Sequence, residues 1–375
     1  MYIFNNIPAS IYSTTYTWSI FLLCMMVVFR YINTDGNRLI YSPNNIPIPA
    51  IILSILIIVP IGFRNPVGYF GDTYFYTHTF LKVLKDYSPI DWSREWLFDN
   101  WMFFFKDYGL PIQYFYLSVA AVYFGSMLVC CYKLCSNNTW IALLFCLVSY
   151  SCYTYSTNGV RNGLSCHLTM LGIIYLTETN WKKVISLLFF VSAYGIHHSS
   201  VLPTVAAVAA TFVIKEPKYA LRFWVASIFI SLIAGNYIGD IFAGLGFDDR
   251  MSSYFQGQED VEEMSRFSAT GFRFDFLLYS AMPVLMTWYV TVKRSFKDRA
   301  FNIIATTYIL ANSFWIMVIR ASYSNRFAYL SWFIYPLVIC YPLLRMNIWE
   351  DQDKKTAQIL LAYAGFTFFM FLIGK

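Results

Sequence analysis

Long apolar runs separated by shorter polar connections dominate this chain. Polar residues gather between the runs and do not alternate with apolar ones, which favours helices over strands. About 20 apolar residues are what an α-helix needs to cross a bilayer. The pattern therefore predicts an all-α polytopic transmembrane bundle of about 12 helices, over residues 15–33, 46–63, 110–134, 139–156, 161–178, 183–197, 199–214, 220–238, 273–292, 300–319, 326–345 and 357–373.

Composition agrees with a membrane protein. The chain is 58% hydrophobic and 13% charged, whereas soluble domains carry roughly 25% charged residues. A β-barrel would show alternating segments of ~10 residues instead. Several middle runs are shorter than ~20 residues, which leaves tilted or re-entrant helices as alternatives. We expect one integral membrane domain over residues 1–375, with the first run retained because residues 1–16 lack the basic n-region of a signal peptide.

The positions of lysine and arginine predict the orientation. If the first connection lies in the cytoplasm, the inner connections hold 15 of the 27 basic residues. Long translocated loops do not count toward the positive-inside rule. We therefore set aside the loops 64–109 and 239–272, with Arg273 at the edge of the second, and only four basic residues then remain in the outer connections. Both termini are then expected to face outward.

Two long outer loops interrupt the runs. Residues 64–109 are rich in aromatic side chains, which predicts short interfacial helices lying on the membrane. Residues 239–272 are polar and acidic, which is typical of a mobile lid.

One acidic residue and a pair of histidines are candidate catalytic groups. Asp72 follows Gly71 early in the first outer loop, where a carboxylate could take a proton from a hydroxyl group; the alternative is a turn or helix N-cap. His197 and His198 end an apolar run on the same side, and imidazole suits a base or a donor to phosphate. Neighbours on a helix point ~100° apart, so adjacency does not tell which histidine faces a site.

Arginines at the outer helix ends are candidates for binding an anion. A guanidinium near lipid is costly unless it is paired or reaches water, and its planar fork matches phosphate. Snorkelling to the interface is the alternative for each. We predict an anion-binding cluster of Arg161, Arg320 and Arg326, and Arg64, Glu95 and Arg250 are secondary site candidates.

Motifs of other enzyme classes are missing or weak. No Walker A, G-x-S-x-G or H-E-x-x-H pattern occurs, which argues against an ATP-driven pump, a serine hydrolase and a zincin. The eight cysteines lack metal-ligand spacing. The sequence Asp351-Gln352-Asp353 matches the metal-binding D-x-D of nucleotide-sugar transferases, but it lies on the cytoplasmic side and we interpret it as a solvated loop. We expect no metal and no cofactor.

Five short motifs together resemble the EpsG family, which belongs with the Wzy-like polymerases of bacterial surface polysaccharides. They are spread over most of the chain, and their order and spacing match the family pattern. In chain order they are R-N-P-V-G-Y-F-G-D-T-Y, G-V-R-N-G-L-S, G-I-H-H-S-S-V-L-P, D-D-R-M-S-S-Y and S-N-R-F-A-Y-L.

The resemblance implies a GT-C-like membrane glycosyltransferase. Such a polymerase moves a growing glycan from undecaprenyl diphosphate to a lipid-linked oligosaccharide repeat unit at the outer face of the bacterial cytoplasmic membrane, and Arg161, Arg320 and Arg326 would bind the diphosphate. We expect an inverting, metal-independent reaction. The product could be capsule, O-antigen or exopolysaccharide. Expected partners are the lipid-linked oligosaccharide and the bilayer, with a chain-length regulator protein as a candidate and no nucleic acid. The alternatives are a membrane O-acyltransferase, a glycan ligase, or a lipid-linked oligosaccharide transporter.

Overall fold

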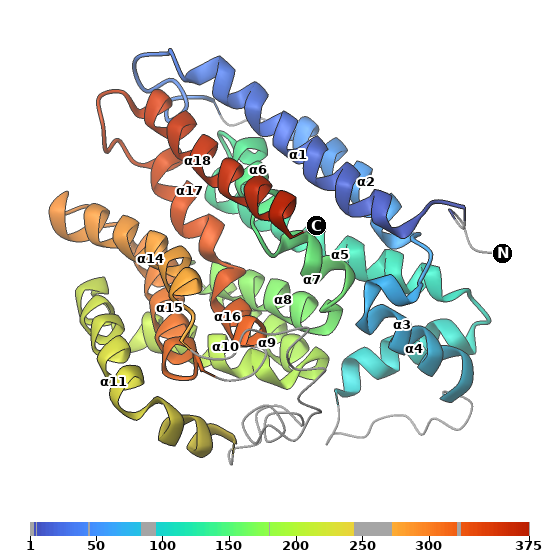
Figure 1. The fold of residues 1–375 in the computed structure, drawn as a ribbon. Helices are drawn as coiled ribbons and strands as arrows, with labels where there is room; N and C mark the ends of the chain where they lie inside the picture. Colours follow the sequence, from blue (N-terminus) through green and yellow to red (C-terminus); the bar gives the residue numbers. More distant parts are fainter. Residues whose placement is uncertain are drawn as a thin grey trace.

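The computed structural model describes residue 4 and residues 6–43, 46–83, 95–179, 181–243, 272–320 and 324–374. Within these residues every regular element is a helix and no strand occurs, so the predicted all-α class is confirmed. Figure 1 shows the helices packed into one bundle, with the two chain ends on the same side of it.

The first half of the chain forms the N-terminal helices and one wall of the bundle. These elements are α1 (Ala9–Tyr31), α2 (Ile48–Gly62), η1 (Gly68–Phe70), α3 (Asp72–His78), η2 (Thr79–Val83), α4 (Trp96–Asp107), α5 (Ile112–Leu134), α6 (Thr139–Leu147), α7 (Cys152–Thr157) and α8 (Val160–Leu176).

The second half completes the bundle and returns to α1. Its elements are η4 (Trp181–Val184), α9 (Ile185–Ile196), η5 (His198–Ser200), α10 (Val201–Phe212), α11 (Pro217–Ala243), α14 (Phe274–Trp288), η6 (Tyr289–Lys293), α15 (Arg299–Met317), α16 (Ser324–Trp332), α17 (Tyr335–Arg345) and α18 (Gln352–Ile373). The C-terminal helix α18 lies beside α1 (Figure 1), and the Phe21 and Phe368 rings stack at 4.2 Å between them.

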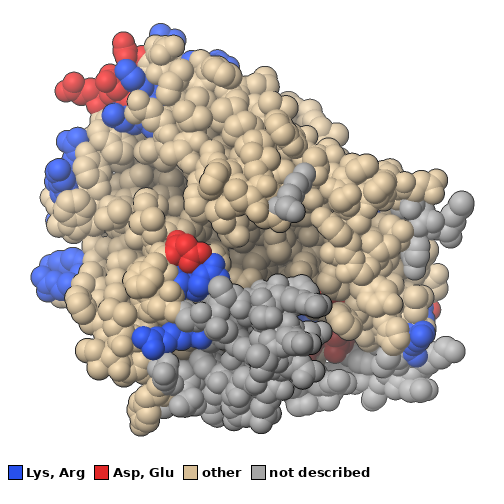
Figure 2. Space-filling model, viewed as in Figure 1, with Lys and Arg blue, Asp and Glu red and all other residues tan. Residues whose placement is uncertain are grey.

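Seven helical segments in the described residues are long and apolar enough to cross a membrane, and two shorter apolar helices accompany them. The chain is therefore a polytopic membrane protein. Each of the twelve predicted runs contains at least one helix, but twelve complete spans are not established by helix length, because α6, α9 and α10 are short. Charged side chains gather at one end of the face drawn in Figure 2, near the loops that precede α2 and α18, and much of the rest is uncharged.

The predicted run 139–156 is not one continuous helix. It divides into α6 and α7 around a turn at residues 148–151, in which the Cys152 N–H donates to the Ser149 carbonyl at 3.0 Å. Helix ends leave carbonyl groups unpaired, and here the Tyr16 hydroxyl donates to the Leu147 carbonyl at 2.7 Å. We refer to residues 148–151 as the α6–α7 break.

The described part of the first long loop contains the short helices that the sequence predicts. Two elements, α3 and α4, lie against one end of the bundle, where the Phe98 and Met102 side chains of α4 are fully buried. The Phe98 ring meets the Phe115 ring of α5 edge-on at 5.3 Å. Of the second long loop, the part at 244–271 lies outside the described residues, and with it the expected lid.

At the opposite end of the bundle, Asp353 ties α18 to the connection between α1 and α2. The interpretation of 351–353 as a solvated loop is wrong for this residue, because its side chain is fully buried. Its carboxylate accepts hydrogen bonds from the backbone N–H groups of Arg38 at 3.0 Å and Leu39 at 3.1 Å. A buried carboxylate is tolerated where backbone donors satisfy it.

Replacing Asp353 by Asn should destabilise the bundle. The amide keeps one acceptor but turns an N–H₂ group toward one of the two backbone donors, which loses about 1–3 kcal/mol. The midpoint of thermal unfolding in detergent should fall for Asp353→Asn and stay at the wild-type value for Asp351→Asn, since Asp351 is exposed. Equal midpoints for the two variants would contradict this function of Asp353.

Candidate functional site

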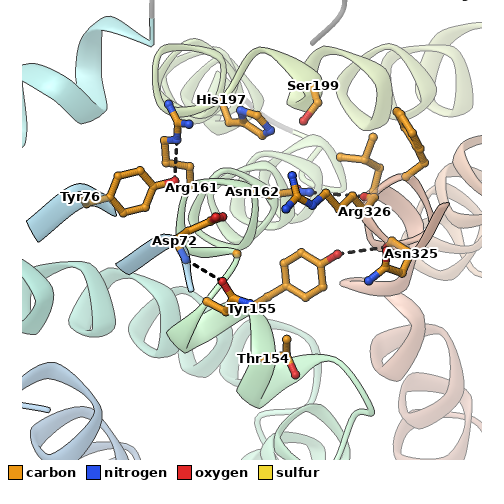
Figure 3. Close-up of a pocket in the computed structure, with 14 residues that line it drawn as sticks. Asp72, Tyr76, Thr154, Tyr155, Arg161, Asn162, His197, Ser199, Asn325 and Arg326 are labelled. Atoms are coloured by element: carbon orange, nitrogen blue, oxygen red, sulfur yellow. Dashed lines mark hydrogen bonds between the residues drawn. The ribbon is translucent and has the colours of Figure 1, made fainter. Parts of the chain in front are cut away.

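A cavity of about 260 Å³ lies at the end of the bundle that carries α3 and α4. Segments far apart in the sequence meet there: α3, the α7–α8 junction, the end of α9 and the start of α16 (Figure 3). The residues that line it are Asp72, Tyr76, Thr154, Tyr155, Asn158, Gly159, Arg161, Asn162, His197, Ser199, Asn325, Arg326, Phe327 and Leu330.

Asp72 is held at the cavity by the turn that precedes it. Gly71 has a φ of 51°, a region that residues with a Cβ rarely adopt. A Cβ on Gly71 would also lie 2.3 Å from Asn158 Oδ1. That same oxygen accepts the Asp72 backbone N–H at 2.9 Å, so the backbone is fixed and the carboxylate is directed toward the cavity (Figure 3).

Glu95 joins two of the predicted site residues. Its carboxylate forms an ion pair with the Arg161 guanidinium through one oxygen and contacts His197 Nδ1 through the other. The three side chains are only partly exposed, at 27% for Arg161, 15% for Glu95 and 14% for His197. Screening by water is weak at such positions, so one carboxylate orients both the guanidinium and the imidazole.

Arg161 has two further contacts. It is the second residue of α8, and its Nε donates to the Tyr76 hydroxyl at 2.8 Å. The guanidinium carbon also lies 5.2 Å from the centre of the Tyr76 ring and 5.9 Å from that of Phe98, within the range of cation–π attraction. These contacts fix the position of the guanidinium group.

His197 lines the cavity and His198 does not. Helix α9 ends at Ile196, and His197 is extended (φ −158°, ψ 121°), which separates the directions of the two side chains. The His198 ring stacks on Tyr194 at 4.5 Å, and its Nε2 is buried with no hydrogen-bond partner in the described part of the chain. The sequence could not distinguish the two histidines. In the structure His197 faces the cavity and His198 packs against α9.

Arg326 enters the cavity from the start of α16 (Figure 3). The backbone on either side of it is anchored from α7 and α8. Asn162 Nδ2 donates to the Arg326 carbonyl at 3.4 Å, and the Tyr155 hydroxyl donates to the Asn325 carbonyl at 3.1 Å. The Tyr155 ring stacks on Tyr329 at 3.5 Å with an interplanar angle of 3°.

The other predicted arginines do not line this cavity. Arg64 is 1% exposed and donates to the Ile61 carbonyl at 2.5 Å, Thr73 Oγ1 at 2.9 Å and the Thr157 carbonyl at 3.1 Å. Arg64 therefore joins α2, α3 and α7 through hydrogen bonds and does not line the cavity. Arg320 lies beside α11, where a Cβ on Gly235 would be 3.5 Å from its Nε. Arg250 lies outside the described residues.

Several lining residues were not singled out from the sequence. Tyr76 is one helical turn beyond Asp72, so spacing on a helix was the available signal for it. Asn162 directly follows Arg161, and adjacency on a helix does not show that both side chains face the same cavity. Asn158 and Tyr155 carry no such signal, because their hydrogen bonds are to the backbone of residues distant in sequence, Asp72 and Asn325.

The cavity combines two guanidinium groups with a carboxylate and an imidazole, and Glu95 partly offsets the charge of Arg161. Cations and a base converging on a small space can bind a phosphorylated ligand and accept a proton. No group of three or more His, Cys, Asp or Glu side chains able to hold a metal ion is found among the described residues.

Fold and site together define a polytopic helical membrane protein with a cation-bearing cavity at one end of its bundle. The chain matches the EpsG family over residues 47–374 and belongs to that family. Comparisons with curated proteins and with solved structures find no match.

Substitution at Gly71 should disturb the site, whereas the same change three residues earlier should not. Gly71→Ala places a methyl group against Asn158 in a left-handed conformation, a strain of about 1–3 kcal/mol. Gly68→Ala is the matched control, because a Cβ there would meet nothing within 4 Å. The thermal unfolding midpoint should fall for Gly71→Ala alone; a Gly71→Ala protein as stable as Gly68→Ala would refute the argument.

Proposed function

We propose that this protein is a polysaccharide polymerase. It transfers a growing glycan from undecaprenyl diphosphate to a lipid-linked oligosaccharide repeat unit, by an inverting reaction that needs no metal, at the outer face of the cytoplasmic membrane. The observation that carries the proposal is the single cavity in which Asp72, Arg161, His197 and Arg326 meet. Membership of the EpsG family supports it, and the 15 to 4 distribution of basic residues between short inner and outer connections supports the orientation.

The two guanidinium groups bind the diphosphate. Negative charge grows on the leaving oxygen as the glycosyl bond breaks, and fixed cations stabilise it most where water is scarce. Arg161 is already oriented by Glu95 and Tyr76, so little ordering is needed when the diphosphate arrives. Arg326 supplies the second charge from the opposite wall.

His197 takes the proton of the acceptor hydroxyl. With Glu95 accepting a hydrogen bond from Nδ1–H, the neutral ring keeps a lone pair on Nε2. The acceptor oxygen forms a bond to the anomeric carbon while the bond from that carbon to the diphosphate oxygen breaks, and the electron pair leaves with the diphosphate. The hydroxyl proton passes to Nε2. Asp72 stabilises the positive charge that develops on the sugar ring, and it aligns the acceptor.

Loss of either cavity arginine should abolish most polymerisation. In cells that lack the gene, we expect single lipid-linked repeat units to accumulate and polymer to disappear. Expression of Arg161→Ala or Arg326→Ala should leave the polymerisation rate about a hundredfold below wild type, the usual effect of removing one charge-stabilising donor. The readout is polymer amount and length, beside membrane levels of each variant.

Arg320→Ala is the control, because Arg320 is outside the cavity lining; it should retain polymer. Unchanged polymer in Arg161→Ala and Arg326→Ala would overturn the proposal. Loss of acetyl groups from polymer of normal length in the deletion strain would instead identify an acyltransferase.

Substitutions of the two histidines should have different effects on the polymerisation rate in the same assay. His197→Gln removes the base and should lower the rate about 10²- to 10⁴-fold, and Glu95→Gln should lower it less, because the imidazole remains but loses its orienting charge. His198→Gln should stay close to wild type, since that ring packs on Tyr194. A loss in His198→Gln as large as in His197→Gln would refute this assignment.

A further inference from the structure

A second and larger cavity adjoins the first. It has a volume of about 860 Å³ and lies under α1 and α18, above the α6–α7 break. Thr154, Tyr155 and Asn325 line both cavities, so the two are adjacent. We refer to the second cavity as the α1–α18 groove. Figure 3 labels these three shared side chains, Thr154, Tyr155 and Asn325, in the lining of the first cavity.

Hydroxyl groups and aromatic rings make up much of this groove, and no charged described residue lines it. The face of α1 that it exposes repeats at helical spacing, with Ser10, Ser13, Thr14 and Thr17 on one side of the helix. The remaining lining residues with hydroxyl or amide groups are Tyr16, Tyr69, Ser149, Tyr150, Ser151, Tyr153, Thr154, Tyr155, Asn325 and Thr367.

Three of these hydroxyl groups are buried without a hydrogen-bond partner in the described structure. They belong to Ser151, Tyr153 and Thr367, and Ser151 is only 5% exposed. Burying a hydroxyl without a partner costs about 1–3 kcal/mol. A prenyl chain cannot supply partners, whereas a ligand rich in hydroxyl groups can.

We propose that the α1–α18 groove binds an uncharged stretch of glycan that continues from the sugar at the diphosphate site. This rests on the proposed function. Neutral hydroxyl groups pair with those of sugar rings, while the faces of Tyr16, Tyr153 and Phe368 pack against their C–H surfaces. The glycan belongs either to the growing donor chain or to the acceptor repeat unit, because both carry the same sugars.

The probe for binding is the repeat-unit oligosaccharide, released by mild acid from lipid-linked intermediates of the deletion strain. Thr17→Trp fills the groove from α1, and Thr15→Trp is its control on the exposed face of the same helix. Thr17→Trp should weaken binding of the oligosaccharide at least about tenfold and leave binding of undecaprenyl phosphate unchanged. Thr15→Trp should match wild type for both ligands.

The Ser151→Ala variant tests whether the Ser151 hydroxyl contributes to ligand binding or to the stability of the fold. Because the Ser151 hydroxyl has no hydrogen-bond partner among the described residues, its removal should leave the thermal unfolding midpoint unchanged or higher, while weakening oligosaccharide binding about two- to tenfold. Oligosaccharide affinity unchanged in both Ser151→Ala and Thr17→Trp overturns the proposal. So does a loss of undecaprenyl phosphate binding alone, which would assign the groove to the lipid.

The polymerisation assay distinguishes the two sources of glycan and the two proposals. Shorter polymer from Thr17→Trp with a normal first coupling supports the growing chain as occupant; a slower first coupling supports the acceptor. If wild type polymerises and Thr17→Trp has normal KM, polymer length and oligosaccharide binding, the proposal of a glycan site in the groove is refuted and the proposed polymerase function is retained. If wild type does not polymerise but Thr17→Trp binds the oligosaccharide more weakly than Thr15→Trp, the proposed polymerase function is refuted and the groove remains a glycan site.

Discussion

The Glu95 carboxylate is the interaction on which the cavity depends. It connects the start of α4 to Arg161 on α8 and to His197 at the end of α9. Without it, a guanidinium and an imidazole would face one another at the end of a bundle, and their charged forms would repel. One anion between them keeps both in place, and its charge partly offsets the positive charge of the Arg161 guanidinium.

Close backbone approach makes this arrangement possible. A Cβ on Gly195 would lie 2.7 Å from the Trp96 ring, which is how α4 reaches the end of α9 and brings Glu95 beside His197. A Cβ on Gly163 would lie 2.3 Å from the Tyr155 carbonyl, so α7 can pack directly on α8. Small residues at helix contacts are common where van der Waals packing holds membrane helices together.

The sequence predicted the helical class and the position of each apolar run, because both depend on local hydropathy and length. It also predicted Arg161 and Arg326 as candidates, since charged groups near lipid are unusual, and Asp72 as a carboxylate in the first outer loop that could accept a proton. It could not choose between His197 and His198, because the choice depends on α9 ending at Ile196. It ranked Glu95 as secondary, because its partner His197 lies 102 residues further along the chain. Arg320 and Arg326 are both predicted at outer helix ends, so the sequence did not distinguish them. In the structure Arg320 packs beside α11, whereas Arg326 lines the cavity.

The α6–α7 break is a local feature with consequences for both cavities. Apolar composition predicts an uninterrupted helix over 139–156, yet the turn at 148–151 redirects the chain toward α16. Because α7 then starts at Cys152, Tyr155 can reach the Asn325 carbonyl beside Arg326, and the Ser151 hydroxyl is left buried at the floor of the groove. A continuous helix would pair its own backbone groups and present a smooth apolar face. Non-helical backbone within a membrane bundle is tolerated where it is enclosed by protein or lines a polar cavity. The break meets both conditions, because Ser149 and Ser151 are buried and also line the groove.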